Sequence, residues 1–449
     1  MNTADIDNDI TQKPAPVSFA EAFIYWLKLG FISFGGPAGQ ISMMHQELVE
    51  RRRWISEKRF LHALNYTMVL PGPEAQQLAT YIGWLMHGVW GGIMAGVLFV
   101  LPSLFILGGL TWAYLVFGDV PAVAGILYGI KPAVTAIVLF AAYRIGSKAL
   151  PNNVLRALAL LAFLAIFVLH IPFPYIVLGA GIIGYIGSRF APEKFKAGGH
   201  HGSSKDTYGP AIIDDDTPTP QYAEFKWTRV FSYLSVGVII WAIAMIALFQ
   251  TYGWDNTLTK MGVFFTKAAL VTFGGAYAVL PYVNESGVAH GWITETQMLD
   301  GLALGETTPG PLIMVIAFVG FVGAWTKEIF GPDMLPLAGV MGAAVATLFT
   351  FLPSFIFILV GGPAVESTRE DAKFTGPLTA ITAAVVGVIL NLAVFFALKV
   401  LWPEGLGGAF EWIAALIGIV AFIALVRFKV GIVTVIAASA AAGLVYSFI

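Results

Sequence analysis

Two lysines stand at equivalent places in two apolar stretches of the chain. Lys28 and Lys267 each precede a Phe-Gly-Gly motif by six residues. A lysine near the centre of a bilayer costs about 2.5–3.5 kcal/mol, so a pair of them indicates a compensating anion or carboxylate. The alternative is that each side chain extends along its apolar stem to the membrane surface. The repeated placement favours an anion site with the two lysines as its basic core.

Glycines and prolines near these lysines predict helix starts that could also hold an anion. Half-helices that begin at Pro37, Pro73 and Pro311 would direct free amide N–H groups and a positive dipole end into one space. Hydroxyl and amide side chains beside these turns could replace the hydration shell of an oxyanion. The predicted substrate-binding residues are Lys28, Ser33, Gly35, Gly36, Pro37, Pro71, Gly72, Pro73, Gln76, Gln77, Lys267, Thr272, Gly274, Gly275, Thr307, Thr308, Pro309, Gly310 and Pro311.

Two carboxylates flank the Pro-Gly-Pro turns. Glu74 directly follows the first turn, and Glu306 precedes the second. Either could carry a coupling proton, although a carboxylate near a helix start is also a common cap. The triplet Arg51-Arg52-Arg53 has two interpretations as well, because it could gather anions or could fix the orientation of the chain in the membrane.

The sequence contains no arrangement typical of an enzyme. We find no Ser/His/Asp set, phosphate-binding loop or metal-spaced His/Glu cluster within the apolar segments. The absence of cysteine excludes disulfides and thiolate metal sites. His200-His201 with Asp214-Asp215-Asp216 could bind a metal, but a solvated linker explains these residues better. We therefore expect no enzyme activity, cofactor, resident metal or nucleic-acid partner. A membrane scaffold or an orphan enzyme without transport is the alternative class.

The lysines and turns belong to an internal duplication. The Phe-Gly-Gly motif recurs with an offset of 239 residues (34 to 273), and Trp-Ile and Pro-Gly-Pro recur with an offset of 238 (54 to 292 and 71 to 309). Leu101-Pro102-Ser103 recurs as Leu352-Pro353-Ser354 with an offset of 251, which predicts an insertion near 325–336. Repeated halves with broken apolar segments are typical of secondary transporters.

Composition places the chain in a membrane, because 57% of its residues are hydrophobic and only 12% are charged. Four apolar regions are broken by the Gly and Pro motifs. They are predicted to be re-entrant hairpins of two half-helices, since irregular backbone survives at membrane depth only beside a cavity. These regions are 19–34 with 38–53, 55–70 with 74–88, 258–291 and 294–326. Runs long enough to cross about 30 Å of hydrocarbon are predicted at 89–117, 122–143, 154–170, 174–188, 229–250, 335–360, 375–398, 410–426 and 430–448.

The distribution of charge predicts how these segments are oriented. With a cytoplasmic N-terminus, most of the 25 Lys and Arg lie inside, and only Lys260, Lys327 and Lys399 lie outside. The span at 229–250 has no partner in the first half and would invert the second half. The expected fold is an all-α polytopic membrane protein whose two homologous halves form an inverted repeat with broken, re-entrant helical hairpins. The expected parts are a cytoplasmic N-terminal tail (1–18), a first repeat (19–188), a disordered cytoplasmic linker (189–228), a connecting helix (229–250) and a second repeat (251–449).

Together the motifs resemble a known family. Phe34-Gly35-Gly36-Pro37, Glu50-Arg51-Arg52-Arg53-Trp54 and the run 70–79, with Phe273-Gly274-Gly275 and Thr308-Pro309-Gly310-Pro311, are similar to the chromate ion transporter family in its long two-domain form. The resemblance covers both halves. It implies a multi-pass inner-membrane protein that exports chromate, a dianion that mimics sulfate, and so confers chromate resistance. In the second half Gly305-Glu306 stands where a Gln is expected, so the resemblance assigns no role to Glu306.

The expected partners are chromate or a related oxyanion, the lipid bilayer and a coupling proton. Export of a dianion from a negative interior is downhill by about 2.3 kcal/mol per charge per 100 mV, so secondary transport is sufficient. Sulfate or another tetrahedral oxyanion is the alternative substrate, and a homodimer is an open alternative for the assembly.

Overall fold

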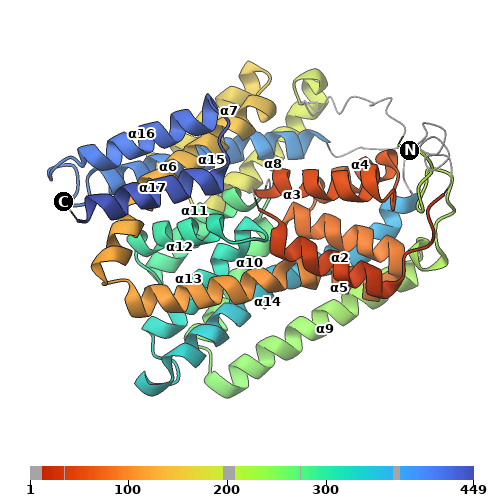
Figure 1. Cartoon of the computed structure of the whole chain (residues 1–449). Coiled ribbons are helices and arrows are strands. Elements are labelled where there is room, and N and C mark those ends of the chain that lie inside the picture. Colours follow the sequence, from red (N-terminus) through yellow and green to blue (C-terminus); the bar gives the residue numbers. More distant parts are fainter. Residues whose placement is uncertain (1–12, 35, 196–207, 274, 368–374, 449) are drawn as a thin grey trace, which may run out of the picture.

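The chain is almost entirely helical. The computed structural model describes residues 13–34, 36–195, 208–273, 275–367 and 375–448. Within these ranges there is no β-strand, and the strand-like contact they contain is an isolated parallel bridge between Ile55 and Ile213. Figure 1 shows the helices packed side by side in one bundle. The prediction of an all-α fold is confirmed.

Four hairpins of short helices turn at the Gly and Pro motifs, as predicted. The first half contains α2 (Phe19–Ile32) with α3 (Gly36–His45) and η1 (Gln46–Arg51), and α4 (Glu57–Val69) with the first part of α5 (Glu74–Phe117). The second half contains α10 (Thr257–Val271) with α11 (Ala276–Ala289), and α12 (Glu295–Thr307) with η4 (Leu312–Met314) and α13 (Val315–Thr326).

The first leg of every hairpin begins at a side-chain cap. Ser18, Ser56, Asn256 and Thr294 each accept a hydrogen bond from a backbone N–H in the first turn of α2, α4, α10 and α12. These legs contain 13 to 15 residues, which at 1.5 Å per residue extend roughly 20–22 Å. Because a full crossing of the hydrocarbon needs about 30 Å, each leg reaches only part of the way.

The ends of the hairpins lie close together within each half, and in the second half Lys327 after α13 lies 3.0 Å from the position of a Cβ on Gly291, just before α12. In the first half, Arg52 at the end of η1 contacts Glu21 at the start of α2, with 3.4 Å between Nη1 and Oε1. His87, where α5 is kinked, bonds through Nε2 to the carbonyl oxygen of Val17 at 2.9 Å. In the second half, one pocket brings Lys260 near the start of α10 together with His290 after α11. We call these two regions the first and second mouths.

The remaining helices are apolar segments at the predicted positions, and most of them are longer than the hairpin legs. They are the later part of α5, α6 (Pro121–Ala149), α7 (Asn153–Phe167), α8 (Phe173–Phe190), α9 (Trp227–Tyr252), α14 (Leu335–Ser367), α15 (Thr375–Leu401), α16 (Trp412–Val426) and α17 (Ile432–Tyr446). Among the described residues, six helices are long and apolar enough to cross a membrane. Three predicted full spans, at 154–170, 410–426 and 430–448, are helices of only 15 residues, so by length alone they are not full spans.

Helix α9 connects the two mouths. It begins after residues 208–226, which lie against the first mouth, and it ends next to Trp254, which lines the pocket of the second. Its 26 residues extend roughly 39 Å at 1.5 Å per residue. Apolar side chains such as Phe231, Ile239 and Ile243 are exposed along it, as expected of a helix that faces lipid. Figure 1 shows α9 running along the outside of the bundle.

The change of offset between the halves has a structural cause. Between Phe-Gly-Gly and Trp-Ile the first half has one residue more than the second. The extra residue is accommodated in η1, a π-helical turn, whereas α11 is a regular α-helix. The later insertion is the loop after α13 with η5 (Pro332–Met334), which separates α13 from α14. In the first half α5 runs through the corresponding region with only a kink at His87 and Gly88.

The expectation of a disordered linker is wrong for residues 208–226. Ile212 and Ile213 donate backbone hydrogen bonds to Arg53 and Trp54, and Ser56 donates one back to Ile213. Ala211, Ile213 and Ala223 are buried, so this segment has an apolar face that its polar composition conceals. It contains η3 (Gln221–Ala223), and η2 (Pro192–Lys194) follows α8. His200 and His201 lie outside the described residues.

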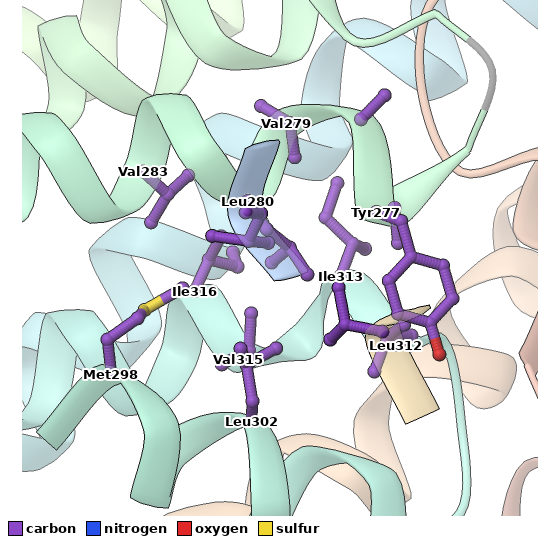
Figure 2. Close-up of a cluster of buried hydrophobic side chains, with 14 of the residues drawn as sticks. Tyr277, Val279, Leu280, Val283, Met298, Leu302, Leu312, Ile313, Val315 and Ile316 are labelled. Carbon is purple, nitrogen blue, oxygen red and sulfur yellow. The ribbon is translucent and has the colours of Figure 1, made fainter. Parts of the chain in front are cut away.

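The second hairpin pair encloses a dense apolar cluster. Figure 2 shows side chains of α11 and α12 meeting those of η4 and α13, including Leu280, Leu302 and Ile313. These side chains are at most 1% exposed. The half-helices are therefore held by packing on their neighbours, because they are too short to be stable alone. This packing fixes the position of their turns.

Candidate oxyanion site

The turns of the two halves bind each other. The N–H of Gly72 donates to the carbonyl oxygen of Thr272 at 2.7 Å, and the N–H of Gly310 donates to that of Ser33 at 2.8 Å. Gly72 and Gly310 are equivalent in the duplication, and so are Ser33 and Thr272. Each half therefore completes the turn of the other. We call this region the central junction.

Two serines pack against these turns in the same exchanged manner. A Cβ placed on Gly72 would lie 2.5 Å from Ser354 Oγ, and one placed on Gly310 would lie 2.7 Å from Ser103 Cβ. Both glycines have positive φ, of 126° and 105°, which disfavours any side chain. Both turns therefore require glycine, because the backbone has a positive φ and because a side chain would collide with the neighbouring serine.

Buried hydroxyl groups at the junction have no hydrogen-bond partner among the residues that the structure describes. They belong to Ser33, Ser103 and Ser354, which are at most 1% exposed. Leaving a buried polar group unpaired costs about 1–3 kcal/mol, and such groups often mark a place for a missing ligand. Three free O–H donors at one junction are suited to a ligand that offers only acceptors. An oxyanion is such a ligand.

Three buried glutamines complete the polar lining. Gln40 donates through Nε2 to the carbonyl oxygens of Gly310 at 2.6 Å and Ser33 at 3.3 Å, and so joins the two halves. Gln77 donates to Pro71 at 2.8 Å, and Gln76 to the hydroxyl of Thr80 at 3.0 Å. The Oε1 atoms of all three glutamines lack partners in the part of the chain that the structure describes.

Helix starts also converge on the junction, close to the predicted positions. Helix α3 begins at Gly36, α5 at Glu74 and η4 at Leu312, each within one residue of the proline named above. The starts of α5, α11 and η4 have no side-chain cap, unlike the capped legs at the mouths. Their first N–H groups are therefore available to a ligand.

Three predicted threonines present a different geometry. The hydroxyls of Thr272, Thr307 and Thr308 donate to carbonyl oxygens of their own helices, at 2.6, 2.9 and 3.0 Å. Their protons are therefore engaged, and the buried serines are the stronger candidates for donation to an anion. Gly36 and Gly275 adopt positive φ at the Phe-Gly-Gly turns. The neighbouring Gly35 and Gly274 lie outside the described residues.

Both predicted carboxylates lie beside the junction. Glu306 is buried and accepts a hydrogen bond at Oε1 from the hydroxyl of Tyr277. Glu74 is partly buried, and its Oε1 lies 3.9 Å from the position of a Cβ on Gly275. Neither carboxylate forms an ion pair within the described part of the chain. Two unpaired carboxylates next to an anion would repel it unless they carry protons.

The structure does not bring Lys28 and Lys267 into the junction. Both side chains are exposed, in contrast to the buried serines and glutamines. Neither lysine forms an ion pair or hydrogen bond in the ranges that the structure describes. On α2 the buried positions are Ala22, Tyr25, Trp26, Leu29 and Gly30, and Lys28 lies off this stripe. The expected basic core of two lysines is therefore absent from the centre, and their part in an anion path stays a prediction.

Other buried charges are paired away from the junction. Arg59 Nη2 contacts Glu366 Oε2 at 2.6 Å, and Tyr81 donates to the other oxygen of Glu366 at 2.5 Å. Lys131 Nζ lies 3.5 Å from Asp300 Oδ1, and the second oxygen of Asp300 accepts from Tyr114 at 3.0 Å. Lys131, which has no basic partner in the repeat, is therefore matched by a carboxylate of the second half.

Arg52 of the arginine triplet, and Asp214 and Asp215 of the linker, also have partners within the chain. Arg52 binds Glu47 and Glu21 and lies over the rings of Tyr25 and Trp54. Asp214 accepts backbone hydrogen bonds within its own turn, and Asp215 accepts one from Ser56 Oγ at 2.6 Å. In the described ranges no three His, Asp or Glu side chains are gathered as a metal site would need.

Sequence reasoning missed Gln40, Ser103 and Ser354 as site residues. The two serines end the repeated Leu-Pro-Ser motif, which was used only to align the halves. A signal for these serines was available in the sequence, because a polar residue follows a helix proline at the same place in both halves. For Gln40 we find no such signal, because its role depends on a contact with the other half, 270 residues away.

Comparison with known proteins agrees with this arrangement of two halves. The family described as "Chromate transporter" matches twice, at residues 20–185 and 259–444. A "Chromate transport protein" of Pseudomonas aeruginosa is 32% identical over 84% of this chain and 80% of its own length. A "Chromate transport protein" of Cupriavidus metallidurans is 28% identical (83% and 81%), and a "Probable chromate transport protein" of Synechococcus elongatus is 27% identical (87% and 87%).

No solved structure matches the chain. The family matches cover both hairpin pairs and the junction between them, and the relatives named above are transport proteins. The chain is thus a multi-pass membrane protein built from two related halves, and it belongs to the chromate transporter family.

Proposed function

We propose that this protein exports chromate across the cytoplasmic membrane by secondary transport and so confers chromate resistance. The single observation that supports this most is the central junction, where turns from both halves meet around buried donors without partners. The family and the names of the relatives indicate the substrate. Sulfate or another tetrahedral oxyanion is the alternative, because it would present the same shape and charge to these donors.

The junction would bind a dianion through neutral donors. Hydroxyls of Ser33, Ser103 and Ser354 and the uncapped starts of α5, α11 and η4 supply N–H and O–H groups in a space shielded from water. Hydrogen bonds to a charged group contribute about 1.5–3 kcal/mol each, so several are needed to replace the hydration of a dianion. Lys28 and Lys267 would attract the anion from the exposed faces of their hairpins and would not hold it at the centre.

Protons on the two carboxylates would couple to the anion. A dianion and ionised Glu74 and Glu306 would repel each other in a medium of low dielectric constant. Binding of the anion therefore favours protonated carboxyl groups, and Tyr277 fixes the orientation of Glu306. In one scheme the proton would be transported together with the anion. In the other, Glu74 or Glu306 would lose its proton when the anion is released.

The arrangement of the mouths supports an inverted repeat. The hairpins of the two halves open near opposite ends of α9, and their turns meet between these ends. With a cytoplasmic first mouth, this places the basic loops inside the cell, as the charge distribution predicts. The anion would reach the junction from either mouth in turn. Two charges moving outward release roughly 4.6 kcal/mol at 100 mV, since each contributes about 2.3 kcal/mol.

We expect the protein in the bacterial inner membrane. Exposed apolar side chains on α7, α8 and α9 are suited to lipid, and nothing about them requires a second copy of the chain. A homodimer would therefore be an addition to a site that one chain already completes.

The experiment is a measurement of chromate accumulation in living cells. Cells that express the protein should accumulate less chromate than cells that lack it, and Gly310→Ala, which places a Cβ against Ser103 at a positive φ, should remove this difference. Accumulation equal to that of cells that lack the protein, with the wild-type protein present in the membrane, would refute export.

A further inference from the structure

The second mouth contains a basic pocket whose counterpart in the first mouth is already filled by carboxylates. The pocket has a volume of about 280 Å³ and lies between α10 and α11. Its polar lining consists of Thr259, Lys260, Lys267, Tyr282, Ser286 and His290. Two lysines, a histidine and hydroxyl groups around one cavity are chemistry for an anion.

The two lysines face the pocket at different depths. Lys260 and Lys267 are seven residues apart on α10, which corresponds to about 10.5 Å along the helix axis. Lys267 is the nearer of the two to Thr272 at the junction. Lys260 contacts Asp255 Oδ1 at 3.3 Å, but Asp255 is 97% exposed on its side chain. An ion pair so exposed is weak and readily replaced by a ligand.

His290 is held in place on the other side of the pocket. Its Nδ1 bonds to the carbonyl oxygen of Ser286 at 2.7 Å, and its ring stacks on Trp292 with 4.6 Å between centroids. The ring of Phe264 lies 6.4 Å away. These contacts fix the imidazole with Nδ1 on the carbonyl oxygen, so that the protonated ring would donate through Nε2 to an anion.

The equivalent place in the first half shows what the pocket lacks. With the offset of 238 that follows the π-helical turn, His290 corresponds to Arg52, and both side chains lie over the equivalent tryptophans, Trp292 and Trp54. Arg52 is bound there by two carboxylates, with Nε 2.8 Å from Glu47 and Nη1 3.4 Å from Glu21.

In the second half the first of those two acids is replaced by a base. With the offset of 239 that applies before the turn, Glu21 corresponds to Lys260, whereas Glu47 lies within the π-helical turn and aligns with Glu285 or Ser286. The first half thus supplies the carboxylate of Glu21 to a cation at this place, whereas the second half has Lys260 there, beside Lys267, His290 and an open cavity.

We infer that the pocket at the second mouth binds a mobile oxyanion between Lys260, Lys267 and His290. The ligand takes the place that carboxylates fill in the first mouth. It is either a free tetrahedral dianion or the phosphate of a lipid headgroup, because both present the same oxygens. The inference rests on the proposed function for the identity of the free anion, which would be the transported one on its way to or from the junction.

The absence of cysteine from the chain allows a local test. Ser286→Cys places one thiol in the pocket of the full-length protein, held in phosphatidylcholine nanodiscs. Sulfate is the probe, since it does not oxidise the thiol. We expect sulfate to slow labelling of the cysteine by a thiol reagent. Adding Lys260→Gln should raise the protective sulfate concentration about tenfold or more, as loss of a charge-assisted contact requires.

The matched control and the lipid arm decide the source of the ligand. Lys399→Gln removes an exposed lysine that is bound to Glu295 outside the pocket, and it should leave the protection by sulfate unchanged. In nanodiscs with phosphatidylglycerol, labelling could be slow even without sulfate. If Lys260→Gln then makes labelling fast again, a lipid headgroup is the ligand. Labelling that neither sulfate nor phosphatidylglycerol slows would overturn the inference.

The two proposals fail separately in this design. Protection by sulfate in a protein that does not transport chromate would refute the proposed function and leave the pocket intact. Chromate transport without protection by either probe would refute the pocket and leave the junction intact.

Discussion

The serines of the central junction allow binding to be separated from folding. Ser33, Ser103 and Ser354 carry buried hydroxyls that find no hydrogen-bond partner within the described ranges. Replacing one of them by alanine removes an unpaired polar group whose burial costs about 1–3 kcal/mol. The free energy of unfolding should therefore stay unchanged or rise slightly, despite the loss of one packed atom.

The same substitutions should weaken transport, although they leave the free energy of unfolding unchanged or raise it. If each hydroxyl donates to the bound dianion, its loss removes about 1.5–3 kcal/mol of binding. At 1.4 kcal/mol for each factor of ten, this raises the KM for the anion by roughly 10-fold to 150-fold. Ser103 and Ser354 are equivalent in the duplication, so their variants should be affected to a similar extent.

The assay combines two measurements on the same variants. Chromate uptake into inverted membrane vesicles gives the KM, and thermal unfolding of the purified protein in detergent gives the stability. Ser439→Ala, on α17 and outside the junction, serves as the control. Serine variants that unfold at lower temperature and keep the wild-type KM would show that the hydroxyls are structural and would refute the reasoning.

Three further predictions follow from the same contacts. Glu306→Gln resembles the protonated carboxyl, so the variant should still exchange anions between vesicles and medium. Its net transport should no longer respond to an imposed pH gradient, and an unchanged response would exclude Glu306 as the coupling group. Arg59→Gln and Glu366→Gln each strand a buried charge, and each should lower the free energy of unfolding by about 3–5 kcal/mol, whereas the double variant should lose less than the two combined. Thermal unfolding checks this, and additive losses would contradict it. Single cysteines at the exposed positions Lys58 and Ala289 should react with an impermeant thiol reagent from opposite sides of the membrane, and labelling from the same side would refute the inverted repeat.

The sequence predicted the hairpins and most of the long helices because those features depend on local patterns. A long apolar run allows few structures in lipid, and a Gly-Pro turn must end a helix. The positions of Pro73 and Pro311 accordingly gave the starts of α5 and η4 to within one residue. The lengths of α7, α16 and α17 were less well predicted, since flanking apolar residues such as Leu169 and Phe410 do not belong to the helices.

The composition of the site depended on contacts between distant parts of the chain. Gln40 binds Gly310, and the linker residue Ile213 pairs with Trp54 and Ser56. No local pattern reports such pairings. Lys28 illustrates a different difficulty: its position in an apolar segment suggested burial, but helix periodicity places it off the buried stripe of α2. In a membrane protein both faces of a helix are apolar, so the buried face is hard to recognise.

The central claim, that a dianion passes through the junction, is tested most directly by chromate uptake into inverted vesicles. A membrane potential positive inside should drive uptake by the wild-type protein, sulfate should compete, and the combined variant Ser33→Ala/Ser103→Ala/Ser354→Ala should abolish uptake while it remains folded in the membrane. Uptake by the triple variant equal to that of the wild type would contradict the claim.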